Sequence, residues 1–279
     1  MALLLIITGL LMSMTSSMMS GWTANSARNE RRDTGRLVLD RISRDLSQTT
    51  LPLSRASTNG LQFVINPTTL TSAFELPQAV FWQAPVATDG STNGNLAVVG
   101  YFVQWVDGAP VLSRLLINPS ATTNYLIYSN PTDWISDSLL ESAAPASESA
   151  NYTGLLAHNV LGLWVQALDP NGNPIQQQAG GLPGENFDSR YPYTYTNSTY
   201  GSTLLTNTPS AMPASLQIAI VVLDSRTAKL LTGSEKPNPA SLTGNFWSDV
   251  HSFYSGLATN IQRGAEIQST VVRLPAGPR

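Results

Sequence analysis

The N-terminus joins a strongly apolar run directly to a helical pattern, and this junction constrains the fold more than any other feature. Ala2 to Met12 read ALLLIITGLLM, and the first charged residue is Arg28. No proline interrupts residues 23–49, whereas Pro52 is placed to stop a helix soon afterwards. The sequence therefore predicts one nearly continuous helix from about residue 2 to residue 49.

The C-terminal part of this predicted helix has a single apolar face. Leu39, Ile42 and Leu46 recur at positions i, i+3 and i+7, which lie on one side of a helix. Opposite charges four residues apart support the helix further: Arg36–Asp40, Asp40–Arg44 and Arg41–Asp45. We expect Leu39, Ile42 and Leu46 to pack against a globular head formed by residues 23–279.

Residues 1–22 are apolar on all sides and predict a membrane or filament-core segment. The compact run of 11 residues from Ala2 to Met12 spans roughly 16 Å as a helix, against about 30 Å of hydrocarbon. It is too short to cross a membrane by itself, although Met14, Met18, Met19 and Trp22 extend it. The residues predicted to serve in the membrane or in assembly are Leu3, Leu4, Leu5, Ile6, Ile7, Leu10 and Leu11.

A cleaved signal peptide is the alternative interpretation of the same run. Such a peptide has basic residues before its apolar core, and none precede this one. The helical pattern also continues beyond the run, where a mature domain would otherwise begin afresh. Both observations favour a retained helix.

The order of these segments resembles the N-terminal helix of type IV pilin-like proteins. The resemblance rests on the apolar run, the Ser/Thr/Gly-rich transition and RLVLDRISRDLSQ at residues 36–48. The sequence is most similar to the minor pseudopilin J of type II secretion and to the related minor pilin W. In those families an Arg/Asp-rich stretch ending in Asp-Leu closes the helix, as Arg44, Asp45 and Leu46 do here. Further similar pieces are Tyr101-Phe102-Val103 with Asp107-Gly108 and Leu112-Ser113-Arg114, His158-Asn159-Val160 with Asp169-Pro170-Asn171-Gly172, and Pro213 to Asp224.

The resemblance implies a subunit held in the inner membrane by a single helix, with its head in the periplasm or outside the cell. It implies partners that are other pilin or pseudopilin subunits, bound through the helix in a pseudopilus or pilus tip for protein secretion. The prepilin leader of the family, with its cleavage glycine, phenylalanine and nearby glutamate, has no match in this sequence. We therefore expect the sequence to begin inside the apolar helix, and peptidase processing is not implied.

The rest of the chain predicts an α+β head in which the long N-terminal helix packs on an antiparallel β-sheet. The four central strands are expected at 98–106, 111–117, 160–168 and 215–223, with a hairpin turn at Asp107-Gly108. Shorter strands are expected at 61–65, 79–83 and 267–274, helices at 133–141 and 245–263, and a long tyrosine-dotted loop at 176–213.

Composition excludes several classes of function. The net charge is −3 and only 12% of residues are charged, so no nucleic-acid-binding surface is expected. Cysteine is absent, which excludes disulfides and thiol catalysis. The two histidines, His158 and His251, accompany no recognisable catalytic motif and are interpreted as structural or surface residues. We therefore expect no enzymatic activity and no cofactor.

Three polar features leave alternatives open. Asp169, Asn171 and Asn173 have a spacing that can bind Ca²⁺, although a tight turn explains them better. The tyrosines of residues 191–200 are expected to cover the sheet, with glycan or subunit binding as the alternative. An extracytoplasmic glycan-binding module is accordingly the second function considered. The arginines just beyond the apolar segment suit either solvent or anionic lipid: Arg28, Arg31 and Arg32.

Overall fold

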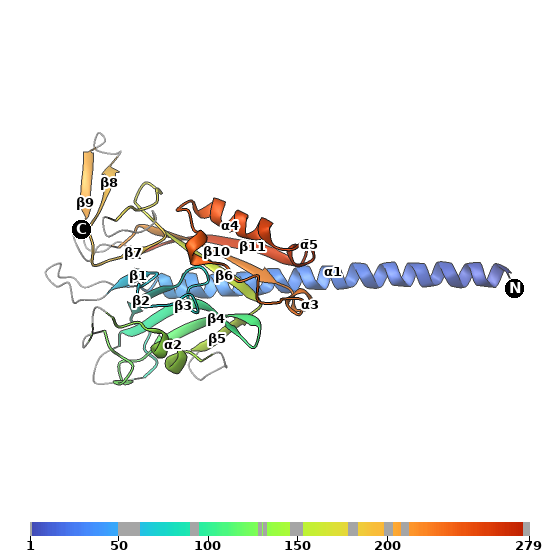
Figure 1. Ribbon diagram of the computed structural model, residues 1–279, viewed down its shortest axis with the longest axis horizontal. Coiled ribbons are helices and arrows are strands. Elements are labelled where there is room, and N and C mark those ends of the chain that lie inside the picture. The colour runs from blue at the N-terminus through green and yellow to red at the C-terminus, as the bar shows by residue number, and fades with distance from the viewer. Residues whose placement is uncertain are drawn as a thin grey trace.

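A computed structural model describes residues 2–49, 62–89, 95–127, 130, 133–145, 153–177, 184–197, 203–207 and 212–275. Side chains are described for these residues except 2–5, 197 and 203–207. A single long helix projects from a β-rich head, with the N-terminus at its far end (Figure 1).

The projecting helix is α1, which spans Ala2–Leu46 without a break. The predicted continuity is confirmed, but the helix ends three residues before the expected residue 49. Its last turn tightens, because the amide of Gln48 donates to the carbonyl of Asp45 (3.2 Å) and that of Thr49 to Leu46 (3.0 Å). Such i to i+3 bonds are common where a helix ends.

The core of the head forms between two antiparallel sheets, where the sequence predicted one, and the described residues also include a separate two-stranded sheet. The larger sheet has the strand order β5-β4-β3-β2-β1-β7. Its strands are β1 (Phe63–Ile65), β2 (Val80–Ala84), β3 (Ala97–Val106), β4 (Ala109–Ile117), β5 (Gly154–His158) and β7 (Phe187–Asp188). The smaller sheet has the order β11-β10-β6, formed by β6 (Val160–Leu168), β10 (Ser215–Leu223) and β11 (Ala265–Arg273).

The four predicted central strands are confirmed as β3, β4, β6 and β10, two in each sheet. The β3–β4 hairpin turns at the predicted dipeptide, where Asp107 and Gly108 have φ of 50° and 81°. Two consecutive positive φ angles match the twist of the flanking strands, and Asp-Gly adopts them readily. The local sequence therefore specifies this turn completely.

The predicted long loop at 176–213 is wrong in part. It contains the short strand β7 and the hairpin of β8 (Tyr193–Asn197) and β9 (Thr203–Asn207). Tyr193 and Tyr195 alternate with threonines, which is the pattern of a strand. The pattern is too short to be recognised from the sequence. The strand β5 was likewise missed, because GLLAH is too short to be distinguished from a loop.

Among the described residues, the head also has the short helical elements α2 (Asp137–Ala143), α3 (Ser225–Ala228), η3 (Pro239–Ser241), α4 (Phe246–Gly256) and α5 (Thr259–Gln262). The helix expected at 245–263 is two helices, because Leu257 adopts an extended backbone (ψ 144°) between them. The helix expected at 133–141 begins only at Asp137, where Ser136 caps it by accepting from the amide of Leu139.

The C-terminal half of α1 lies between the two sheets, which flank it on opposite sides (Figure 1). The central core joins this half to inward residues of the larger sheet, such as Trp82, and of the smaller sheet, such as Ile218 and Ile220. The outer face of each sheet is also covered, the larger by α2 through Leu139 and Leu140 and the smaller by α4 through Phe246 and Val250. Because both faces are buried, the central strands are apolar at almost every position.

Candidate assembly surface

The N-terminal half of α1 presents apolar side chains that are exposed to the surroundings. Residues 6–26 are all exposed. The exposed fractions of the large apolar residues are Ile6 62%, Ile7 50%, Leu10 60%, Leu11 60%, Met12 76%, Met14 62%, Met18 74%, Met19 65% and Trp22 76%. Leu3, Leu4 and Leu5 belong to the same helix, but their side chains lie outside the described residues.

The hydroxyl groups of this half are satisfied within the helix. Thr15 donates to the carbonyl of Leu11, and Thr23 donates to that of Met19 (3.0 Å). Ser20 donates to the carbonyl of Ser17 (2.9 Å). These internal bonds reduce the polarity that Ser and Thr present to the surroundings. The Ser/Thr-rich transition therefore does not interrupt the apolar character of the surface as strongly as its composition indicates.

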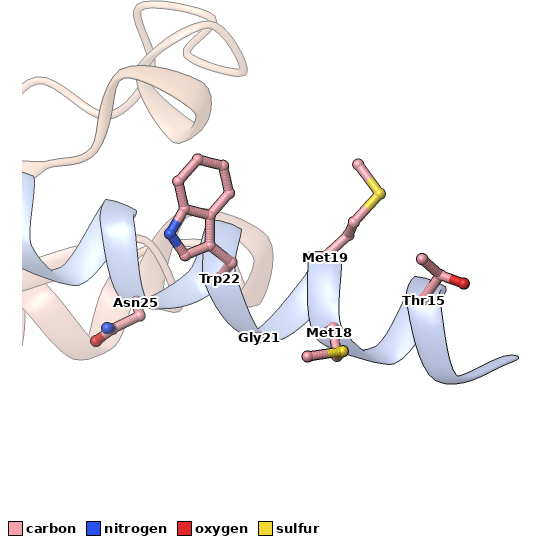
Figure 2. Close-up of a pocket in the computed structure, with 6 residues that line it drawn as sticks. All are labelled: Thr15, Met18, Met19, Gly21, Trp22 and Asn25. Carbon is pink, nitrogen blue, oxygen red and sulfur yellow. The ribbon is translucent and has the colours of Figure 1, made fainter. Parts of the chain in front are cut away.

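A shallow hollow lies along this surface next to the head. Met18 and Met19 project from one turn and Trp22 from the next, on the two sides of Gly21, with Thr15 and Asn25 at the two ends (Figure 2). A Cβ atom at Gly21 would meet no atom within 4 Å. The missing side chain of Gly21 between large neighbours thus leaves the hollow, which is open to the surroundings. We call residues 6–25 the exposed segment.

Within the described residues, no helix is both long enough and apolar enough to span a bilayer.

Ionic contacts fasten α1 to the head where the exposed segment ends. Arg31 lies 3.0 Å from Asp224 and 3.6 Å from Glu266, and Arg32 lies 3.4 Å from Glu266. Glu30 accepts from the amide (3.1 Å) and the hydroxyl of Ser225. Arg31 and Arg32 thus contact the head, whereas Arg28 is exposed. These contacts fix the point at which the helix leaves the head.

The other end of α1 is fixed by a buried polar cluster. Asp45 is 2.7 Å from Nε of Arg114 and accepts from the hydroxyl of Tyr101 (2.6 Å). Arg41 adds a contact of 3.5 Å to the same carboxylate. Tyr101 and Arg114 are directly opposed across the β3–β4 hairpin. Burial first, and then the Asp45 carboxylate, raise the pKa of Tyr101 well above its usual range.

Sequence reasoning missed this cluster, although a signal for it exists. From the sequence, Asp45 was expected to support the helix as a partner of Arg41 and to form part of the Arg44-Asp45-Leu46 match, but its side chain was not expected to be buried, as it is. Arg114 stands in an otherwise apolar strand, and a buried arginine requires an acidic partner. The stripe predicted to pack on the head is buried in the core between the sheets: Leu39 (7% exposed), Ile42 (0%) and Leu46 (0%). Val38, which the prediction did not include, joins it there.

The candidate calcium ligands form a tight turn. The Asp169 carboxylate accepts from the amides of Asn171 and Asn173, each at 2.8 Å. Asn171 donates its side-chain amide to the carbonyl of Thr196. Gly172 adopts φ of 82° and donates to the carbonyl of Asp169 (3.0 Å). Turn formation accounts for each residue type here, and among the described residues no cluster of three His, Cys, Asp or Glu is placed to hold a metal.

The tyrosines and histidines considered in the sequence analysis differ in burial. Tyr193 is buried in the core and donates its hydroxyl to the carbonyl of Met212 (2.8 Å), whereas Tyr191 is 45% exposed. Tyr200 lies outside the described residues. His158 and His251 are both exposed, and His251 stacks on Trp247 with 5.7 Å between ring centroids. The buried Tyr193 covers the core, as the preferred interpretation of the tyrosines expected.

Comparison with known proteins finds a similar chain among solved structures but none by sequence. The sequence matches no protein-family model and no curated protein. Among solved structures, a type IV-like pilin from Thermus thermophilus is similar at 12% identity and a TM-score of 0.34. The alignment covers 89% of this chain and 98% of that one. A TM-score this low does not establish a shared detailed structure.

Proposed function

We propose that this chain is a pilin-like subunit whose exposed segment packs with the N-terminal helices of other subunits. The observation that carries the proposal is the contrast along α1. One continuous helix has a half that is enclosed by two sheets and a half on which every described large apolar side chain is exposed. A helix that is apolar all round requires burial against lipid or against other helices.

Burial of the exposed segment would be favourable in free energy. Burying a large apolar side chain is worth about 1.5–3 kcal/mol. The exposed segment presents nine of them, from Ile6 to Trp22, and leaves them in solvent. Because the ionic contacts of Arg31 with Asp224 and Glu266 hold the helix in its projecting direction, the segment does not fold back on the head. Burial therefore has to come from outside the subunit.

The finer assignment is an inner-membrane protein that assembles into a pseudopilus or pilus tip for protein secretion, with its head outside the cytoplasm. It is supported by the resemblance of residues 36–48 to the pseudopilin J and pilin W helices. The residues proposed for membrane retention and assembly remain Leu3, Leu4, Leu5, Ile6, Ile7, Leu10 and Leu11. The proposal assigns no catalysis, no cofactor and no nucleic-acid partner.

Truncation tests the proposal. The full-length chain and a chain starting at residue 23 are expressed and compared by sedimentation and membrane partitioning. The full-length chain is expected to self-associate or partition into membranes without detergent, whereas the truncated chain is expected to be a folded, soluble monomer. A second variant replaces Leu10 and Leu11 with asparagine in the full-length chain. This variant is expected to associate more weakly than the unchanged full-length chain. A full-length chain that stays monomeric in detergent-free buffer would refute the proposal.

A further inference from the structure

Exposed basic side chains gather at the end of the head from which α1 projects. The helices α3 and α5 both lie at this end (Figure 1). Its exposed basic residues are Arg226 and Lys229 of α3 and its cap, Arg263 at the end of α5, and Arg28 of α1. We call these four residues the basic collar. Within the part of the chain that the structure describes, none of their side chains takes part in a hydrogen bond or an ion pair.

Close contacts around Asp224 hold the elements of the collar together. The side chain of Arg31 in α1 lies 3.0 Å from the Asp224 carboxylate, which caps α3. The amide of Asp224 donates to the carbonyl of Gly264 (3.1 Å), which follows α5. A Cβ atom at Gly264 would clash with the side chain of Thr227, so α3 packs directly on the turn after α5. The collar is therefore one surface formed by three elements.

The carboxylates that join these elements are already neutralised within the head. Asp224 and Glu266 both pair with Arg31, at 3.0 Å and 3.6 Å. Glu30 accepts from the amide (3.1 Å) and the hydroxyl of Ser225. These contacts turn the acidic groups inward, whereas the cations of the collar face outward. The outer charge at this end of the head is therefore mainly positive.

Two exposed acids flank the collar without cancelling it. Asp33 lies five residues beyond Arg28 in α1, about 7.5 Å farther from the exposed segment. Asp107 is in the β3–β4 turn, and close to that turn Lys236 lies over the ring of Trp105, with Nζ 5.3 Å from the ring centroid. The cations at this end thus outnumber the exposed acids, and they attract a surface of negative charge.

Exposed apolar side chains accompany these cations. Leu230, which follows Lys229, is 50% exposed. Trp22 is 76% exposed and precedes Arg28 by six residues, which is about 9 Å along the helix. Tryptophan is enriched at the boundary between lipid and water, and arginine and lysine reach from apolar surfaces to charged headgroups. The order along α1 of apolar residues, Trp22 and Arg28 therefore matches the layers of a lipid surface.

We propose that the basic collar binds the anionic headgroups of a phospholipid surface when the exposed segment is buried in lipid. The inference rests on the membrane retention proposed above, and it adds a ligand class and an orientation, in which α3 and α5 face the headgroups. Each basic residue near an anionic membrane strengthens binding about fivefold. An acidic surface of another subunit is the competing occupant. Leu230 and Trp22 favour lipid, because a purely ionic contact would leave both apolar side chains in water.

Co-flotation of the full-length chain with phospholipid vesicles tests the collar. The vesicles consist either of phosphatidylcholine alone or of an equal mixture of phosphatidylcholine and phosphatidylglycerol, and the floating fraction gives each partition coefficient. The wild type is expected to partition into the anionic vesicles on the order of 100-fold more strongly than into the neutral ones. Added salt is expected to reduce this difference, because it screens exposed charges.

Two double variants separate the collar from charge in general. Arg226→Gln combined with Arg263→Gln removes collar charges from two elements and is expected to reduce the preference for anionic vesicles roughly 30-fold. Arg36→Gln combined with Arg273→Gln is the matched control, because both arginines are exposed and lie outside the collar. The control is expected to keep the wild-type preference. All four positions are exposed, so neither variant is expected to unfold the head.

The outcomes distinguish the collar from the membrane retention on which it rests. Equal partitioning of the wild type into both vesicle types would refute the collar and leave membrane retention intact. A wild type that floats with neither type would refute both. A control variant that loses as much preference as the collar variant would also overturn the collar. If the collar variant floats like the wild type but self-associates more weakly in sedimentation, the surface belongs to an acidic subunit partner and the lipid assignment is wrong.

Discussion

The two halves of α1 show how one helix serves two environments. The C-terminal half is enclosed by two sheets, with Ile42 and Leu46 fully buried, whereas Met18 and Trp22 in the N-terminal half are about three-quarters exposed. Helix geometry is the same in both halves, so the difference lies in the pattern of apolar residues. A single apolar stripe directs the C-terminal half into the head, and apolar residues on all sides leave the N-terminal half for external partners.

The largest expected effect comes from a charge placed in the enclosed half. Ile42→Asp puts an unpaired carboxylate at a position with 0% exposure, which costs several kcal/mol and is expected to unfold the head. Leu37→Asp is the control, because Leu37 lies on the same helix but is 60% exposed. Near-UV circular dichroism with thermal unfolding in detergent measures both. Similar melting temperatures for the two variants would contradict the enclosed packing.

Substitution in the buried polar cluster is expected to cause the second-largest loss of stability. Asp45→Ala leaves the buried guanidinium of Arg114 without its main partner and is expected to cost about 3–5 kcal/mol of unfolding free energy. Asp45→Leu combined with Arg114→Met removes both charges and is expected to be less damaging than the single change. Chemical denaturation of the two variants gives the comparison. A double variant that is less stable than Asp45→Ala would show that the pair contributes more than the cost of burying its charges.

Titration of Glu75 is expected to change the stability of the head by an intermediate amount. Burial first, and then Asp137, raise the pKa of Glu75 from 4.5 to about 7. Because the folded state holds this proton more tightly, stability is expected to fall between about pH 4.5 and pH 7. The partly exposed carboxyl limits the change to on the order of 1 kcal/mol. Glu75→Gln should remove this part of the fall in a pH series of melting temperatures, and an unaltered series would contradict it.

Substitution in the exposed segment is expected to change the unfolding free energy least. Trp22 is 76% exposed, so Trp22→Ala is expected to change the unfolding free energy by less than about 0.5 kcal/mol. Trp82 is fully buried between α1 and the larger sheet, and Trp82→Ala is expected to cost about 3–5 kcal/mol. Denaturant titration in detergent measures both tryptophan variants. A loss at Trp22 comparable to that at Trp82 would mean that the segment packs on the head.

Several parts of the molecule were predictable because their signals are local. The helix from residue 2 onward follows from an unbroken pattern, and the β3–β4 turn follows from the φ angles that Asp107 and Gly108 tolerate. The strands β6 and β10 follow from long runs of β-branched and apolar residues. The short strands β5, β7, β8 and β9, each of two to five residues, escaped prediction.

By itself, the sequence determined the long N-terminal helix, the four central strands and which part of α1 is apolar on every side, because these depend on neighbours a few residues apart. Only the tertiary structure decided that the strands divide into two sheets around α1, and that Asp45 is buried with Arg114 and Tyr101. Such pairings depend on which surfaces close over each other, and a local pattern does not encode the partner of a buried charge.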